Sequence, residues 1–213
     1  MVLSSIGKKE LMALTGIGFV GFLIVHLAGN FTMLAGGEAF NAYAAKLESL
    51  GPLVLVAEGG MLLMAMLHVV FGFALILRNL QARGTRYASK KGEGGRTLGS
   101  WTMWLTGPWI LAFIGIHLAH FTIEHKLMGN EAPLSQLVAE RLADPIWAGY
   151  YILSVFVVGL HVSHGFWSAF QTLGAAPERK GHLRDAAILL GFVFGAGYGL
   201  LAFFVFYIRD LLT

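Results

Sequence analysis

Four histidines lie deep inside long apolar runs of this chain, and no other feature constrains its fold as much. They occur in FLIVHLAGN, MAMLHVVFG, FIGIHLAHF and VVGLHVSHG, and they are His26, His68, His117 and His161. A polar, ionisable side chain is costly at membrane depth, so such residues usually serve a function. The neutral imidazole is also the commonest side-chain ligand for a metal ion. The pattern therefore predicts a membrane helix bundle that carries a metal centre.

The composition supports lipid as the solvent of this chain. Of its 213 residues, 56% are hydrophobic and only 13% are charged, whereas a soluble domain has about 25% charged residues. The absence of cysteine excludes disulfides, iron–sulfur clusters bound by this chain, c-type haem attachment and cysteine-based zinc sites. The net charge of +3 is explained by basic cytoplasmic loops, so we expect no nucleic-acid partner.

Five apolar runs are long enough to cross a hydrocarbon core of about 30 Å at 1.5 Å per residue. They cover about residues 11–35, 52–77, 101–123, 146–173 and 186–208. We therefore expect a single domain over residues 1–213, an all-α bundle of five transmembrane helices. Eleven lysines and arginines fall in the N-terminus and the second and fourth connections, and four fall on the other side. This bias predicts a cytoplasmic N-terminus.

The depth of each histidine in its helix sorts the four into two layers. His26 and His117 lie 15 and 16 residues from the cytoplasmic ends of their runs, which places them roughly 22–24 Å above that boundary. His68 and His161 lie 16 and 15 residues from the outer ends, roughly 6–8 Å above the same boundary. A haem iron takes two axial ligands on opposite faces. The pattern predicts two stacked b haems, each held by two histidines.

Two further histidines stand close to this set. His120 and His164 lie one turn beyond His117 and His161, on about the same face. They compete as ligands, or they bond a haem propionate, a quinone or a neighbouring helix. The alternative for every buried histidine is a hydrogen bond across helices or a proton path; the two depth-matched pairs favour haem. Three of the ligand histidines are followed after three or four residues by a glycine, where a porphyrin ring needs space; these glycines are Gly29, Gly72 and Gly165. We expect His125 and His182 to lie in solvent.

These residues together resemble a known family. The chain is similar to the single-subunit, five-helix, di-haem cytochrome b that anchors succinate dehydrogenase and menaquinol:fumarate reductase in the membrane. The resemblance covers nearly the whole chain. It is carried by His26 with Asn30, GEAFNAYAAKLESL at residues 37–50, His68 with Gly72, LTG before His117, and His161 through Trp167. It implies that His26 and His117 hold the distal haem on the outer side and that His68 and His161 hold the proximal haem.

The resemblance also implies a role. Electrons would pass between a quinone, menaquinone by resemblance, and an iron–sulfur subunit on the cytoplasmic face, which relays them to a flavoprotein acting on succinate or fumarate. The chain would be the electron-transfer and quinone-site subunit of a succinate:quinone oxidoreductase in a prokaryotic inner membrane, with FAD and iron–sulfur clusters on its partners. Glu48 matches an acidic residue that the family uses at the quinol site, where a carboxylate accepts protons; a solvated loop acid is the equal alternative. Glu58 is either another proton-transfer group or an interfacial acid turned toward the bundle, and the second is expected.

Two positions depart from the family pattern. Gly159 stands where some members have a glutamate that compensates transmembrane electron flow with a proton, and Trp104 stands where relatives often have an arginine. Two other functions compete: the haem subunit of a nitrate reductase or formate dehydrogenase, whose ligands are distributed differently, and a transporter with a histidine relay. A transporter would show repeated halves and broken helices, which the sequence lacks. The direction of turnover, the quinone, the electrogenicity and the pairing of two complexes into a dimer stay open.

Overall fold

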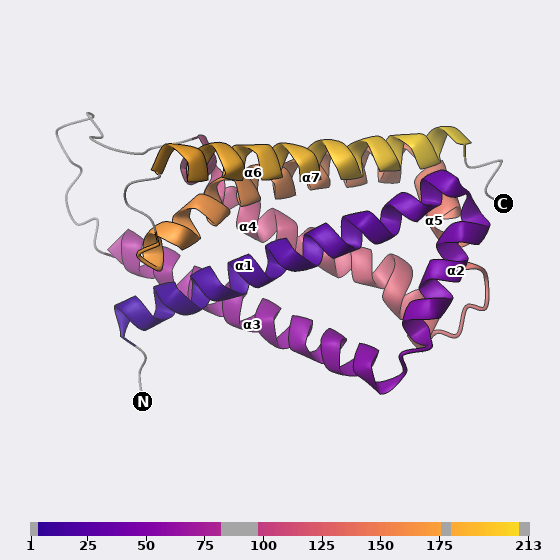
Figure 1. Ribbon diagram of the computed structural model, residues 1–213, viewed down its shortest axis with the longest axis horizontal. Coiled ribbons are helices and arrows are strands. Elements are labelled where there is room, and N and C mark those ends of the chain that lie inside the picture. The colour runs from indigo at the N-terminus through magenta and orange to yellow at the C-terminus, as the bar shows by residue number, and fades with distance from the viewer. Residues whose placement is uncertain (1–3, 82–97, 176–179, 209–213) are drawn as a thin grey trace.

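The computed structural model describes residues 4–81, 98–175 and 180–208, and this part of the chain is helical without a strand. Five long helices run lengthwise through the molecule (Figure 1). They are α1 Ser5–Asn30, α3 Pro52–Gln81, α4 Leu98–His117, α6 Pro145–Thr172 and α7 Lys180–Ile208. The 3-10 helix η1 Phe31–Ala35 extends α1, and the π-helix η2 Leu118–Leu127 extends α4. Five stretches are long and apolar enough to cross a membrane, which confirms the predicted all-α, five-span architecture.

The helix ends follow local chemistry that hydropathy does not register. The side chain of Ser4 accepts a hydrogen bond from the Gly7 amide at the start of α1. Asp144 accepts from the Ile146 amide, and Pro145 occupies the first turn of α6, where its missing N–H is not needed. The helices α4 and α7 begin at residues 98 and 180, before the predicted 101 and 186. The prediction from hydropathy missed these first turns because they are polar or contain glycine.

Two short helices cover one end of the bundle, the end where α1 finishes (Figure 1). They are α2 Gly37–Glu48 and α5 Leu134–Ala143, and both lie between the five apolar runs, where no helix was predicted. Each is amphipathic: Phe40 of α2 and Leu137 of α5 are buried. Asn41 joins them, since its amide donates to Ser135 Oγ at 2.9 Å and its oxygen accepts from the Ser135 amide at 2.9 Å.

The tightest packing lies between α6 and α7. A Cβ atom added to Gly159 would lie 2.3 Å from the Gly191 carbonyl oxygen, and one added to Gly191 would lie 2.4 Å from the Gly159 oxygen. Small residues allow such close helix contact in membranes. By contrast, the most apolar window of α3 has 0% of its residues buried, against 33% in α6 and 39% in α7. The α6–α7 pair is therefore the packed spine, and α3 lies along α1 with open faces.

The predicted orientation depends on residues outside this description. Most of the expected cytoplasmic basic residues fall in residues 82–97 and 176–179, which lie outside the described residues. The cytoplasmic N-terminus therefore stays a prediction. We use "outer end" below for the end of the bundle that α2 and α5 cover, and "inner end" for the opposite end.

Candidate functional site

The structure brings the four histidines together in the two pairs that the depth arithmetic predicts. The rings of His26 on α1 and His117 on α4 have centroids 5.9 Å apart and planes at 87°. The rings of His68 on α3 and His161 on α6 have centroids 6.4 Å apart and planes at 63°. A metal–imidazole bond of about 2.0–2.1 Å places the centroids of two opposed rings about 6 Å apart. Both pairs, named the outer and the inner pair here, have the spacing that one metal ion between two imidazoles requires.

The inner pair is held by two threonines that the sequence analysis did not assign. Thr15 Oγ1 on α1 lies 3.0 Å from His68 Nδ1, and Thr106 Oγ1 on α4 lies 3.0 Å from His161 Nδ1. Both threonines are buried. Their signal in the sequence is a polar residue within an apolar run, at the depth of the histidine layer. Each imidazole of the inner pair is thus held by one threonine hydroxyl at the same distance.

The outer pair is surrounded by aromatic rings, among them those of Tyr198 beside His26 and Tyr151 beside His117. The ring of His26 stacks on Phe22 with centroids 5.1 Å apart. The ring of His117 lies 5.8 Å from Phe113 and 5.2 Å from Phe121. The Nδ1 atom of His117 is buried and has no hydrogen-bond partner. A buried polar atom without a partner is rare and costly, so this ring suits a bond to a group that the chain does not itself supply.

The space beside the inner pair is open. A Cβ atom added to Gly165 on α6 would meet no atom within 4 Å, and one added to Gly72 on α3 would meet only Met12 Sδ at 3.8 Å. These two glycines thus leave the room that the sequence analysis expected beside His161 and His68. Gly29 differs, because an added Cβ atom would lie 2.5 Å from the hydroxyl oxygen of Tyr43. That glycine admits the Tyr43 ring of α2, so its expected role beside His26 is wrong.

His120, which lies in η2, turns toward α6. His120 Nδ1 lies 3.2 Å from the Tyr151 hydroxyl, and its ring meets Trp147 edge-on at 4.5 Å. The π-helix η2 begins directly after His117, which alters the spacing of an ordinary helical turn. Of the expected roles, this geometry favours the bond to a neighbouring helix. His164 is half-buried on α6, one turn beyond His161.

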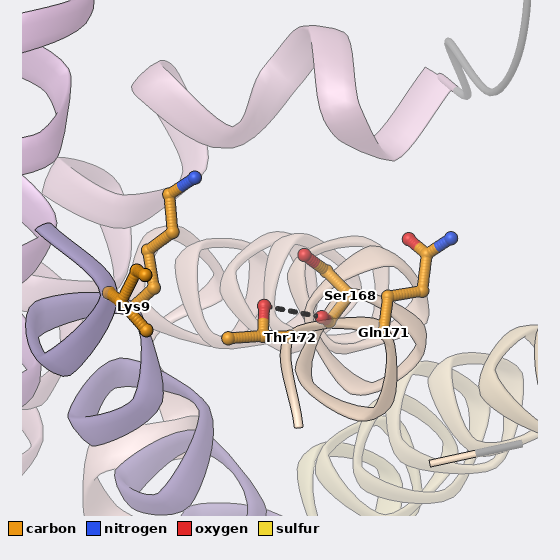
Figure 2. Close-up of a pocket in the computed structure, with 5 residues that line it drawn as sticks. Lys9, Ser168, Gln171 and Thr172 are labelled. Carbon is orange, nitrogen blue, oxygen red and sulfur yellow. Dashed lines mark hydrogen bonds between the residues drawn. The ribbon is translucent and has the colours of Figure 1, made fainter. Parts of the chain in front are cut away.

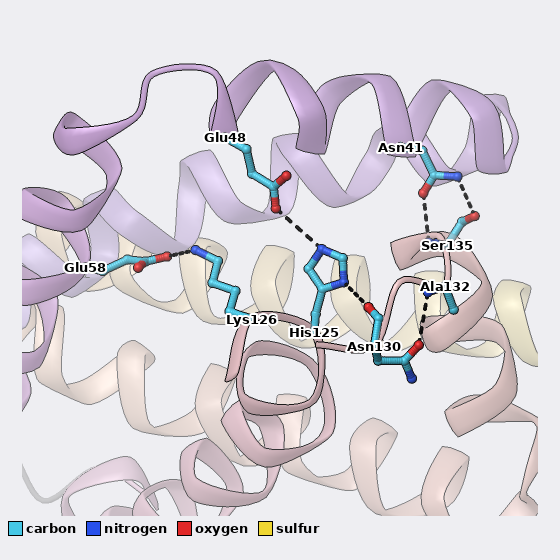
Figure 3. A network of polar contacts seen from close by, with 8 residues as sticks. All are labelled: Asn41, Glu48, Glu58, His125, Lys126, Asn130, Ala132 and Ser135. Carbon is cyan, nitrogen blue, oxygen red and sulfur yellow. Dashed lines mark hydrogen bonds and ion pairs between the residues drawn. The ribbon is translucent and has the colours of Figure 1, made fainter. Parts of the chain in front are cut away.

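Glu48 lies at the outer end, at the last residue of α2, with its side chain 52% exposed. Its carboxylate is 3.5 Å from His125 Nε2 of η2, and His125 Nδ1 is 3.1 Å from the Asn130 carbonyl oxygen (Figure 3). His125 was predicted to lie in solvent, but its side chain is 26% exposed and contacts both Glu48 of α2 and the Asn130 carbonyl. Glu48 and His125 form the one carboxylate–imidazole contact found within the described residues.

The neighbours of His125 make two further ion pairs. Lys126 pairs with Glu58 of α3 (Figure 3), and Glu124 pairs with Arg141 of α5. The side chain of Glu58 is 45% exposed, as expected for an interfacial acid. Three consecutive residues of η2 thus each contact a different helix at the outer end.

The inner end carries a polar pocket. Figure 2 shows this pocket of about 300 Å³, which Ile6 and Lys9 of α1 line together with Ser168, Gln171 and Thr172 of α6. Ser168 follows His161 by seven residues (168 − 161), two helical turns along the same face of α6. The pocket therefore lies beyond the inner pair, on the face of α6 that carries its histidine.

Comparison with known proteins finds one similar protein of known family. No family model matches the chain, and no solved structure matches it. The chain is 29% identical over 205 residues to the succinate dehydrogenase cytochrome b558 subunit of Bacillus subtilis (strain 168), a match that covers 93% of this chain and 95% of that protein. The part of this chain outside the match is shorter than any one of the five candidate membrane helices, so the match reaches all five. The protein is a multi-pass protein of the bacterial inner membrane, and it is similar over nearly its whole length to a succinate dehydrogenase cytochrome b membrane subunit.

Proposed function

We propose that this chain binds two b haems and carries electrons across the membrane between a quinone and an iron–sulfur partner. His26 with His117 would hold the outer haem, and His68 with His161 the inner one. The single observation that carries the proposal is the pairing of rings at 5.9 and 6.4 Å across four different helices. Among the described residues no three metal-ligating side chains gather at one point, whereas a haem iron needs only two.

The residues at both pairs fit such a group. Neutral imidazole ligates without adding charge, which suits a site surrounded by lipid and apolar helices. Two independent observations support a bound group at these sites: Nδ1 of His117 is buried without a hydrogen-bond partner, and the space beside Gly165 is open. A bound haem supplies a one-electron carrier. The chain supplies its ligands, holds them at fixed separation on α1, α3, α4 and α6, and keeps water away with apolar side chains.

Quinol oxidation needs a proton acceptor as well as an electron acceptor. Glu48 is proposed for this role, with menaquinol as its substrate by resemblance. Its carboxylate lies at the outer end, 3.5 Å from His125, so an accepted proton has a second titratable group within reach. His125 in turn contacts the Asn130 carbonyl oxygen at 3.1 Å near the surface. This arrangement supports proton release on the outer side.

The partner chains follow from the relative, which is a subunit of succinate dehydrogenase. The inner end of this chain would dock an iron–sulfur subunit, which would pass electrons to a flavoprotein that interconverts succinate and fumarate. The polar pocket of Lys9 and Ser168 lies at this end and would face that partner.

Absorbance spectroscopy tests the proposal on the complex purified from membranes. We expect a reduced-minus-oxidised α-band and a haem-to-protein ratio of about two. Replacing His26 or His68 by Ala should each remove one haem, whereas replacing the exposed His182 by Ala, the matched control, should remove none. Copurifying flavoprotein and iron–sulfur chains, with succinate–quinone and quinol–fumarate activity, would support the partner assignment. A colourless complex, or full haem content in both ligand variants, would overturn the ligand assignment.

A further inference from the structure

We infer that Thr15 and Thr106 are positioning residues for the inner pair, which fix its histidines in one tautomer and tune the inner haem. The inference rests on the proposed function, because it concerns the residues that would ligate that haem. Each threonine hydroxyl lies 3.0 Å from the Nδ1 atom of one ligand histidine. A group that bonds the second ring nitrogen of a ligating histidine sets its orientation and its donor strength.

The direction of the Thr15 hydrogen bond follows from counting protons. A threonine hydroxyl has one proton to donate and two lone pairs. Thr15 Oγ1 lies 2.7 Å from the Leu11 carbonyl oxygen and 3.1 Å from the Met12 carbonyl oxygen; both can only accept, and we assign the hydroxyl proton to these backbone acceptors. With that assignment the contact with His68 runs from the ring, and Nδ1–H donates to Thr15 Oγ1 at 3.0 Å. Nε2 of His68 is left with its lone pair, the form that binds a metal ion.

Thr106 repeats this arrangement on the other side of the inner pair. Its hydroxyl donates to the Met103 carbonyl oxygen at 3.4 Å and meets His161 Nδ1 at 3.0 Å. Thr15 is 6% exposed and Thr106 is 5% exposed, so water has little access to either contact. Because both rings are tethered through Nδ1, both present Nε2 to the space between them.

The two threonines also occupy equivalent places on their helices. Thr15 precedes His26 by 11 residues (26 − 15), and Thr106 precedes His117 by 11 residues (117 − 106). Eleven residues are close to three full turns, or roughly 16 Å along the axis, and return to the same face. Each of α1 and α4 thus presents a ligand to the outer pair and a hydrogen-bond acceptor to the inner pair. This spacing agrees with the difference in depth expected from the sequence.

The expected effect has a definite sign. A hydrogen bond from Nδ1–H to an acceptor makes the imidazole more basic, and a more basic ligand favours the oxidised, more positive iron. Removing either hydroxyl should therefore raise the midpoint potential of the inner haem. At a fixed ambient potential we expect the reduced-to-oxidised ratio of that haem to rise several-fold; a tenfold rise corresponds to 59 mV for one electron.

Thr→Val and Thr→Ser variants at positions 15 and 106, in the intact complex, test this. Valine keeps the shape and removes the hydroxyl, and serine keeps the hydroxyl. Thr32→Val is the matched control, since Thr32 bonds only the Gly29 carbonyl of its own segment, at 2.6 Å. Haem content, redox titration of the α-band and the low-spin electron paramagnetic resonance spectrum are measured, and His68→Ala identifies the inner component.

We expect the valine variants to raise the inner potential or to lose the inner haem, the serine variants to match the parent, and Thr32→Val to change neither component. Valine variants with parental potential and haem content would overturn the inference, and so would serine variants as altered as the valine ones. These results would leave the proposed function standing, provided that the parent carries two haems. A parent complex without haem would instead refute the proposed function itself.

Discussion

Replacement of Gly159 by alanine should separate the two helices of the packed spine. An added Cβ atom would lie 2.3 Å from the Gly191 carbonyl oxygen, whereas ordinary carbon–oxygen contacts begin at about 3.3 Å. Since the obstacle is backbone, α6 and α7 must move apart by about 1 Å. Overpacking of this kind costs roughly 1–3 kcal/mol. We therefore expect Gly159→Ala to lower the free energy of unfolding by that amount.

The matched control is Gly149→Ala on the same helix. A Cβ atom added there meets nothing within 4 Å, so this variant should be neutral or gain up to about 1 kcal/mol from helix propensity. The assay is reversible unfolding in mixed micelles, followed by circular dichroism and tryptophan fluorescence. Equal stability of the two variants would refute the close-contact argument. A glutamate at residue 159 would need still more space, so the family's proton-compensating side chain cannot be restored here without moving α7.

Three more outcomes are expected at the outer end. Glu48→Gln should slow quinol oxidation by about 10²-fold or more if the carboxylate is the general base, and it should leave the haem content unchanged. The control Glu38→Gln, on the exposed first turn of α2, should leave the rate of quinol oxidation unchanged. Steady-state assays with a soluble menaquinol analogue measure both variants. Asn41→Ala should cost about 1–3 kcal/mol in thermal unfolding, because it leaves the buried Ser135 unpaired; stability equal to the parent would contradict this. Glu58→Gln should cost under about 1 kcal/mol, because its pair with Lys126 is partly exposed; a larger loss would show a structural role.

The membrane helices and the histidine pairs could be predicted because each depends on a simple length. A run of apolar residues fixes where a helix crosses, and a residue's distance from the end of the run fixes its depth. His26 and His117 are 91 residues apart (117 − 26) in the sequence, yet equal depth on two helices was enough to bring their rings within 5.9 Å. Predicting which helices are neighbours needed no more than this coincidence of depth.

The short helices and the threonines could not be predicted in this way. The residues of α2 and α5 are polar on one side, so a hydropathy reading treats them as connections. Thr15 lies in an apolar helix where a hydroxyl ordinarily bonds its own backbone, which it also does here. Its second contact, with His68, depends on the rotation of α1 against α3. Neither the composition nor the depth of a residue predicts how one helix is rotated against its neighbour. The contact between Gly159 and Gly191 could not be predicted for the same reason.

The ion pairs of η2 have a mechanical consequence for the outer pair. Glu124, His125 and Lys126 are tied to α5, α2 and α3 in turn, and consecutive helical residues point in different directions. The end of η2 is therefore held from three directions, and a change in its tilt would lengthen at least one of these contacts. His117 directly precedes η2, seven residues before Glu124 (124 − 117), so we expect the loss of one of these ion pairs to alter the position of that imidazole relative to His26. The contact of Glu48 with His125 thus links the surface of the outer end to the helix that carries His117.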